Sequence, residues 1–153
     1  MVNFDKQEGE EKNTHILGDP LEKELFDFSA AKFSLLEDIS GKSPYMKVFS
    51  VISGKKSENL GVRQVFSFKS ELQRMSVIVD CIEAKETFSF VKGAPERILE
   101  LSDKTTLPTD FNAQVTDLAK SGFRVIAFGC KKLDSDRLDQ EYSREESENN
   151  LTF

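Results

Sequence analysis

The sequence RMSVIVDCIEAKETFSFVKG, residues 74–93, carries the clearest indication of the architecture of this chain. It contains two runs rich in β-branched and aromatic residues, RMSVIVDCI and ETFSFVKG, separated only by Glu83, Ala84 and Lys85. Two such runs joined by a short connection predict an antiparallel β-hairpin. The rest of the fold is expected to assemble around this hairpin.

Outward from the hairpin, the apolar patterns predict further strands and several helices. Strands are expected over residues 45–52, from Val62 through residue 70, and over residues 123–133, whereas the polar residues 53–61 are expected to form a loop. Helices are expected over residues 18–29, 94–101 and 110–121. Antiparallel strands mixed with helices predict the α+β class, with a twisted antiparallel sheet flanked by helices.

The expected helix over residues 18–29 has strong helix-start chemistry. Asp19 can cap it, Pro20 suits the first helical position, and Glu22 stands three residues after the cap, as in a capping box. Its apolar face is expected to be formed by Leu21, Leu25 and Phe28.

Composition bounds the domain organisation and the partners. The 153 residues suit one domain, with residues 1–14 expected to be a flexible start or loop and 15–153 to be the domain itself, as a monomer. A net charge of −6 does not favour binding to nucleic acid or to an anionic membrane surface. Insertion of this chain into a membrane is not expected, because no run of about 18 apolar residues occurs.

No metal site is expected from the cysteine and histidine residues. Cys81 and Cys130 lie inside apolar runs without metal-ligand spacing, so we expect buried free thiols. His15 is the only histidine, which leaves no histidine cluster for metal binding or general-base chemistry.

The end of the second hairpin strand is a candidate ligand site. Lys92 would place its ammonium at the rim of the sheet, and Gly93 would allow close approach to the backbone. A helix that begins near Pro95 would direct free N–H groups toward the same place, which suits a phosphate or a polar ring edge. The alternative is a solvated lysine before an ordinary helix start.

Phe68, Arg124 and Glu22 each allow two interpretations. Phe66 and Phe68 have period-two spacing, so both are expected on one strand face, either as core residues or with Phe68 stacking on a purine. Arg124, at an expected strand start, could meet phosphate oxygens or pair with a surface acid. Glu22 could cap its own helix or accept a hydrogen bond from an adenine amino group.

Asp103-Lys104-Thr105 resembles the phosphate-accepting signature Asp-Lys-Thr-Gly-Thr. Here Thr106 and Leu107 follow in place of Gly-Thr, and an expected helix, not a buried strand, precedes Asp103. The glycine matters because a phosphate needs close approach to the backbone. We therefore expect a surface loop and no catalytic residue in this chain.

Four blocks in order resemble the nucleotide-binding domain of a P-type ATPase, a membrane cation pump. They are KGAPE at 92–96, FKSELQRMSV at 68–77, GFRVIA at 122–127 and GDPLE at 18–22. The resemblance extends from about His15 to Phe153. GDPLEKELF, LQRMSVIV and LPTDFN are similar to the type-five branch, and within it to the polyamine-transporting pumps.

The resemblance implies a set of nucleotide-binding residues. It assigns base stacking to Phe68, a place deep in the pocket to Lys92, close ring approach to Gly93, phosphate contact to Arg124, the adenine edge to Glu22 with Asp19 one turn earlier, and the apolar wall to Met75. One departure is Ser70, where many calcium-type pumps have an arginine. Phosphate contacts are therefore expected to be fewer here.

The resemblance also implies how the domain works. It is expected to bind ATP, as Mg-ATP with the magnesium ligands mainly outside this domain, and to present the γ-phosphate to an acceptor aspartate elsewhere. The tail would return toward a phosphorylation domain absent from this chain, and that domain and the actuator domain would be partners. The longer protein that contains this domain would be a pump in an endosomal, lysosomal, vacuolar or other organelle membrane, with this domain in the cytosol. The alternatives are a degenerate domain that binds proteins and a stand-alone phosphohydrolase.

Overall fold

The computed structural model describes residues 3–4, 16–17, 20–36, 44–53, 56–135 and 141–153. His15, Asp19 and most of the expected flexible start lie outside the described residues. Strand β1 (Asn3–Phe4), which lies within that start, pairs with β2 (Ile16–Leu17), which follows it, in a two-stranded sheet.

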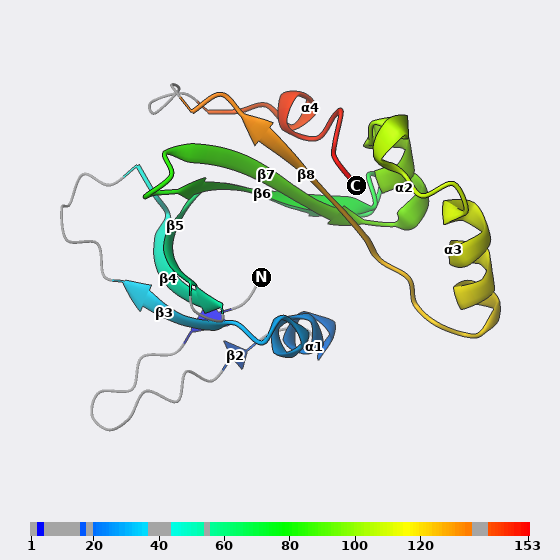
Figure 1. Ribbon diagram of the computed structural model, residues 1–153, viewed down its shortest axis with the longest axis horizontal. Coiled ribbons are helices and arrows are strands. Elements are labelled where there is room, and N and C mark those ends of the chain that lie inside the picture. The colour runs from blue at the N-terminus through cyan, green and yellow to red at the C-terminus, as the bar shows by residue number, and fades with distance from the viewer. Residues whose placement is uncertain (1–2, 5–15, 18–19, 37–43, 54–55, 136–140) are drawn as a thin grey trace.

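The predicted α+β architecture is confirmed by a six-stranded antiparallel sheet flanked by helices. Its strands follow chain order: β3 (Lys32–Leu36), β4 (Lys47–Ser53), β5 (Lys56–Lys69), β6 (Arg74–Cys81), β7 (Glu86–Gly93) and β8 (Ala127–Leu133). Figure 1 shows that the sheet is strongly curved, so that β3 and β4 lie across its concave side from β6, β7 and β8. We call the concave side the inner face and the other side the outer face.

Helix α1 (Pro20–Ser29) lies on the inner face. The ring of Phe26 contacts that of Phe33 on β3 with centroids 5.0 Å apart, and Phe33 contacts Phe49 on β4 at 5.9 Å. The prediction that Phe28 belongs to the apolar face of this helix is wrong, since its side chain is 91% exposed. Leu21, Leu25 and Phe26 are the half-buried apolar residues, because residues four apart lie above one another on a helix.

The remaining helices follow the hairpin in sequence. They are α2 (Pro95–Leu101), the short 3₁₀ turn η1 (Lys104–Thr106), α3 (Phe111–Lys120) and α4 (Arg144–Ser147). Helix α2 begins at Pro95 as predicted, where the missing N–H of proline costs nothing. The outer face is covered by α2, α4 and the C-terminal residues (Figure 1).

The hairpin of β6 and β7 is confirmed, with Cys81 opposite Glu86 at its closed end and Arg74 opposite Gly93 at its open end. Two strand predictions are wrong. β5 begins at Lys56, within the expected polar loop, because its polar first half is paired with β4 through backbone hydrogen bonds. β8 begins only at Ala127, so that Arg124 precedes the strand and does not start it. β3 has no counterpart among the predicted strands.

Two hydrophobic clusters form the core, and both lie on the outer face. One contains Val91, Ile98, Ala127 and Leu151; the other contains Ile78, Leu133 and Tyr142, with Phe66 packed against it. Phe66 is thus a core residue. Cys81 and Cys130 are free thiols, as predicted, but they are half-buried and not buried, because the inner face that carries them is only partly covered.

Candidate functional site

A row of three side chains crosses the inner face at the open end of the hairpin. Met75 on β6, Lys92 on β7 and Phe128 on β8 are direct cross-strand partners. Partners in an antiparallel sheet share a face, and residues one step along the strand point to the other face. The next residues, Ser76 and Val91, are buried in the outer face, so the row of Met75, Lys92 and Phe128 faces inward.

Phe68 joins this row because of a bulge in β5. Phe66 is paired with Ser76 and Lys69 with Arg74, so β5 has one residue more than β6 between these pairs. The extra residue places both Ser67 and Phe68 opposite Met75. The prediction that Phe66 and Phe68 share one face is therefore wrong: Phe66 packs in the core, whereas Phe68 lies beside Met75 with 59% of its surface exposed.

Glu22 reaches the row from α1. Its carboxylate forms an ion pair with the ammonium of Lys92, and the two side chains are 26% and 20% exposed. Because α1 is anchored on β3 through Phe26, this ion pair connects opposite parts of the curved sheet. Both charges are thus held at the inner face, partly shielded from water.

Gly93 has a structural reason to be glycine. A Cβ atom built on it would lie 2.6 Å from the carbonyl oxygen of Gln73 and 2.7 Å from the Cβ of Arg74. The same Gln73 carbonyl accepts a hydrogen bond from the N–H of Ala94 at 3.0 Å. Close packing at the start of β6 therefore requires a glycine, and a ligand contact by Gly93 stays a prediction.

Arg124 is exposed in the segment between α3 and β8. That segment leads to Ala127, which is paired with Gly93, so Arg124 lies beyond the end of the sheet at which Lys92 is found. The structure thus gathers Phe68, Met75, Lys92 and Glu22 closely, while Arg124 belongs to a neighbouring loop.

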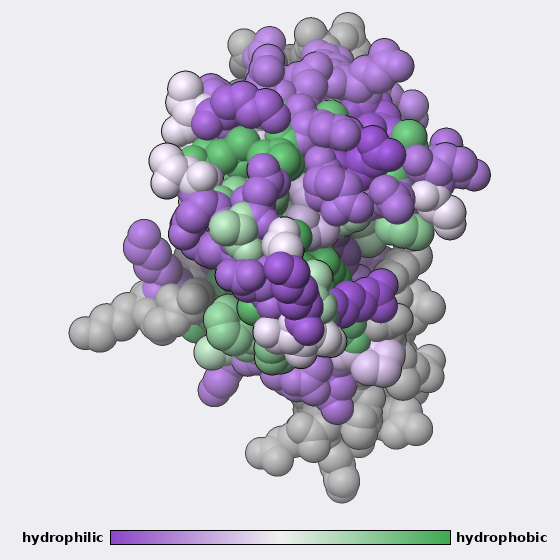
Figure 2. All heavy atoms as spheres, turned by 90° about the vertical axis from the view of Figure 1, so that its right-hand side faces the viewer, coloured by the Kyte–Doolittle hydropathy of each residue, from purple (hydrophilic) through white to green (hydrophobic). Residues whose placement is uncertain are grey.

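Phe128 is the neighbour of Lys92 that sequence reasoning missed. It is 49% exposed and directly opposite Lys92 in the β7–β8 pair. Its alternation with the buried Ala127 and Gly129 could have indicated an inward-facing aromatic residue, had the register of β8 been known. Seen from the side where the helices α1 to α3 lie, hydrophobic side chains are exposed between the many polar ones (Figure 2).

Asp103 lies in a surface loop, as predicted. It follows α2 and caps the turn η1, accepting hydrogen bonds from the N–H of Thr105 at 2.9 Å and from its hydroxyl at 2.8 Å. These hydrogen bonds lower the pKa of Asp103 below its ordinary value, with the larger effect from the Thr105 N–H and the smaller from its hydroxyl. Its carboxylate thus has a capping role. In the part of the chain that is described, no three His, Cys, Asp or Glu side chains gather into a possible metal site.

Comparisons with known proteins show the family of the chain. Residues 2–153 match the family model described as P-type ATPase, cytoplasmic domain N, and the chain belongs to this family. The predicted resemblance to the N domain of a P-type ATPase is thereby confirmed. No helix in the described ranges is long and apolar enough to cross a membrane.

Its relatives include pumps of the type-five branch, as predicted. The chain is 35% identical over 167 residues to "Vacuolar cation-transporting ATPase YPK9" of Saccharomyces cerevisiae, with 91% of the chain covered. It is 33% identical over 145 residues to human "Probable cation-transporting ATPase 13A4", with 90% of the chain covered, and 40% identical over 97 residues to human "Polyamine-transporting ATPase 13A3", with 61% covered. The alignments span 11%, 12% and 8% of these relatives, respectively.

Proposed function

We propose that this domain binds ATP on its inner face and presents the γ-phosphate to an acceptor aspartate in another domain of a type-five pump. The observation that carries the proposal is the row of Phe68, Met75 and Lys92, with Glu22 facing it from α1. An exposed ring, an apolar neighbour and a cation in one line suit a flat heterocycle attached to phosphates.

The dimensions of the row suit an adenosine. Neighbouring strands of a sheet lie about 4.8 Å apart, so a base stacked on Phe68 can cover Met75 and reach toward Lys92. The carboxylate of Glu22 accepts hydrogen bonds, as the exocyclic amino group of adenine requires. Arg124, in the adjacent loop, is the candidate for phosphate contact, with Gly93 and Asp19 as further candidates near the base.

Under this proposal, the domain contributes to the reaction by positioning the nucleotide. The acceptor aspartate and most magnesium ligands would belong to the phosphorylation domain, and the actuator domain would complete the cycle. Holding the nucleotide so that its terminal phosphate meets the acceptor in line converts a bimolecular encounter into an intramolecular one. The domain alone is expected to bind ATP without hydrolysing it.

The longer protein that contains this domain would be a cation pump of an organelle membrane, with this domain exposed to the cytosol. Polyamine is the proposed cargo because a relative of this chain is named a polyamine-transporting ATPase. The membrane segments that would select the cargo are not part of the matched family region.

Calorimetric titration of the chain with ATP tests the proposal, with Phe68→Ala as the variant and Phe28→Ala as its control. Both phenylalanines are exposed, by 59% and 91%, so neither loss should affect folding much. Base stacking is worth about 1–3 kcal/mol, so Phe68→Ala should weaken binding by about fivefold to a hundredfold. Phe28→Ala should leave it unchanged. If the parent chain binds no ATP at millimolar concentration, the proposal fails in favour of a degenerate, protein-binding domain.

A further inference from the structure

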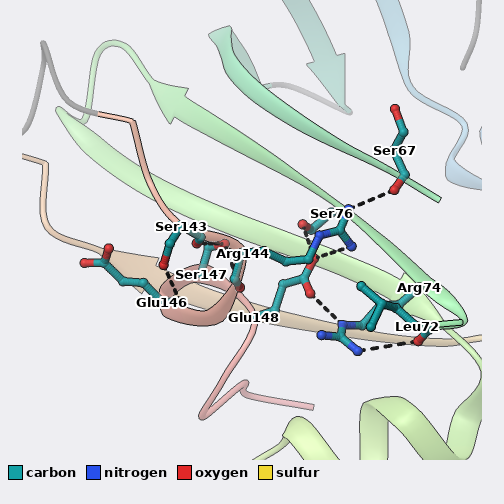
Figure 3. Close-up of polar contacts among 9 residues, drawn as sticks. All are labelled: Ser67, Leu72, Arg74, Ser76, Ser143, Arg144, Glu146, Ser147 and Glu148. Carbon is teal, nitrogen blue, oxygen red and sulfur yellow. Dashed lines mark hydrogen bonds and ion pairs between the residues drawn. The ribbon is translucent and has the colours of Figure 1, made fainter. Parts of the chain in front are cut away.

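A buried carboxylate on the outer face is connected to the bulge that carries Phe68. The residue Glu148, at the end of α4, is 1% exposed. It accepts hydrogen bonds from Arg74 Nε at 2.5 Å, from the Ser76 hydroxyl at 2.6 Å and from Arg144 Nη1 at 3.2 Å (Figure 3). Three donors on two different elements therefore fix this carboxylate, which in turn orients both arginines.

Arg144 extends this network to the backbone of β5. While Nη1 binds Glu148, Nη2 donates a hydrogen bond to the main-chain carbonyl of Ser67 at 2.8 Å (Figure 3). The guanidinium also lies over the ring of Phe66, 5.1 Å from its centroid. A bulge interrupts the regular ladder of hydrogen bonds, so a carbonyl within it benefits from an outside donor. Arg144 is such a donor, and the carbonyl that it binds belongs to Ser67, the residue immediately before Phe68.

The other side of the bulge is connected to the same carboxylate. Lys69 is paired with Arg74, whose Nε binds Glu148 and whose Nη1 donates to the Leu72 carbonyl at 3.4 Å. The network therefore contacts the chain both immediately before Phe68 and in the turn that follows it. Phe68 itself is 59% exposed, so packing of its own ring does little to fix its orientation.

We propose that Glu148 and Arg144 are positioning residues for Phe68: from the outer face they fix the backbone conformation that directs its ring to the nucleotide on the inner face. This inference rests on the proposed function of Phe68 as the stacking platform. A ring held in place before binding loses less conformational freedom when the base arrives, so affinity depends on the network although neither residue touches ATP.

The test compares two substitutions of Arg144 with a control at a neighbouring lysine. Arg144→Met keeps an apolar stem over Phe66 but removes the donor to Ser67, and Arg144→Lys restores one donor. Lys131→Met is the matched control, because Lys131 donates to the Glu146 carbonyl at 3.0 Å and to Asn149 Oδ1 at 2.7 Å. It therefore loosens the surroundings of α4 without touching the bulge.

The readout is ATP affinity in two backgrounds, the parent chain and Phe68→Ala. Arg144→Met should weaken ATP binding roughly three- to tenfold in the parent and have no further effect once Phe68 is alanine. Arg144→Lys should recover part of the loss, Glu148→Gln should behave like Arg144→Met, and Lys131→Met should leave the affinity unchanged. An equal loss in both backgrounds, or a loss with Lys131→Met as large as with Arg144→Met, overturns the inference.

A second measurement separates this inference from the proposed function. Without nucleotide, ¹⁵N relaxation should show increased motion at Ser67 and Phe68 in Arg144→Met but not in Lys131→Met. If the parent binds no ATP, the proposed function fails and the role as platform falls with it. If the unmodified chain binds ATP but Ser67 and Phe68 stay as rigid in Arg144→Met as in the unmodified chain, only the positioning role is overturned.

Discussion

The ammonium of Lys92 on β7 and the carboxylate of Glu22 on α1, 70 residues apart in the chain, form an ion pair across the inner face of the sheet. It brings together a charge at the rim of the hairpin and a helix anchored on β3. A ligand that approaches Lys92 therefore meets a cation already partly balanced by Glu22. The first two predictions concern the two members of this pair.

Replacing Lys92 with methionine should weaken ATP binding by about tenfold or more, since hydrogen bonds to a charged group contribute about 1.5–3 kcal/mol. Unfolding free energy should fall by less than about 1 kcal/mol, because the pair is partly exposed to solvent. Lys132→Met is the control: Lys132 forms an exposed pair with Glu86 at 2.6 Å, further along the same strands. Equal losses of affinity in both variants would contradict the assignment of Lys92.

Replacing Glu22 with glutamine separates two roles of this carboxylate. If it accepts a hydrogen bond from adenine, Glu22→Gln should weaken ATP binding several-fold and reduce the preference for ATP over GTP, since an amide can also donate to the guanine carbonyl. We expect this result in competition titrations with both nucleotides. Tighter ATP binding by Glu22→Gln would instead mean that Glu22 only neutralises Lys92.

Asp103 should never be phosphorylated. Incubation with γ-labelled ATP should give no hydroxylamine-sensitive label in the parent chain or in Asp103→Asn, and a label lost with Asp103→Asn would restore the phosphohydrolase hypothesis.

Hydrogen bonds lower the pKa of the Asp103 carboxyl below its ordinary value of 3.8. Its contribution to stability should therefore be fully present above about pH 4 and be lost as the pH falls through the lowered pKa of the folded state. The difference in Tm between the unmodified chain and Asp103→Asn should therefore shrink in acid.

Asp80 should matter for stability and not for nucleotide binding. It is buried on β6, accepts a hydrogen bond from the Thr87 hydroxyl at 2.6 Å and lies 3.7 Å from Arg63 Nη1. Burial, together with the charge of Asp80 and a hydrogen bond to it, raises the pKa of Tyr45. Asp80→Ala leaves a buried arginine without this partner and should cost about 3 kcal/mol in urea unfolding.

Asp117→Ala, on the exposed side of α3, is the control for Asp80→Ala and should change stability by less than about 0.5 kcal/mol. The ATP affinity of folded Asp80→Ala should match that of the parent. A large loss of affinity without a loss of stability would contradict the purely structural role assigned to Asp80.

The parts of this fold that the sequence predicts are those with strong local patterns. The β6–β7 hairpin has two dense apolar runs and a short turn, and α2 has a proline at its start, so both were predictable from neighbouring residues. The first half of β5, from Lys56, was not, because its polar side chains hide a strand that depends on pairing with β4.

The candidate site shows the same limit. Lys92 at a strand end and the aromatic residue Phe68 are visible in the sequence, and the resemblance to known pumps supplies their roles. The bulge that separates Phe66 from Phe68 is not visible, because one extra residue in a strand leaves no mark on the composition. Phe128 was missed for a related reason, since only the register of β8 puts it beside Lys92.

The most direct test is an ATP titration followed by two-dimensional NMR of backbone amides and aromatic rings. Saturable shifts are expected, centred on Phe68, Met75, Lys92 and Phe128, with buried outer-face residues such as Ile78 changing little. In Phe68→Ala the same shifts should require about fivefold to a hundredfold more ATP, while the signals of the folded chain remain. Spectra unaffected by millimolar ATP, or shifts gathered on the outer face around Ile98 and Leu151, would contradict the proposed inner-face site.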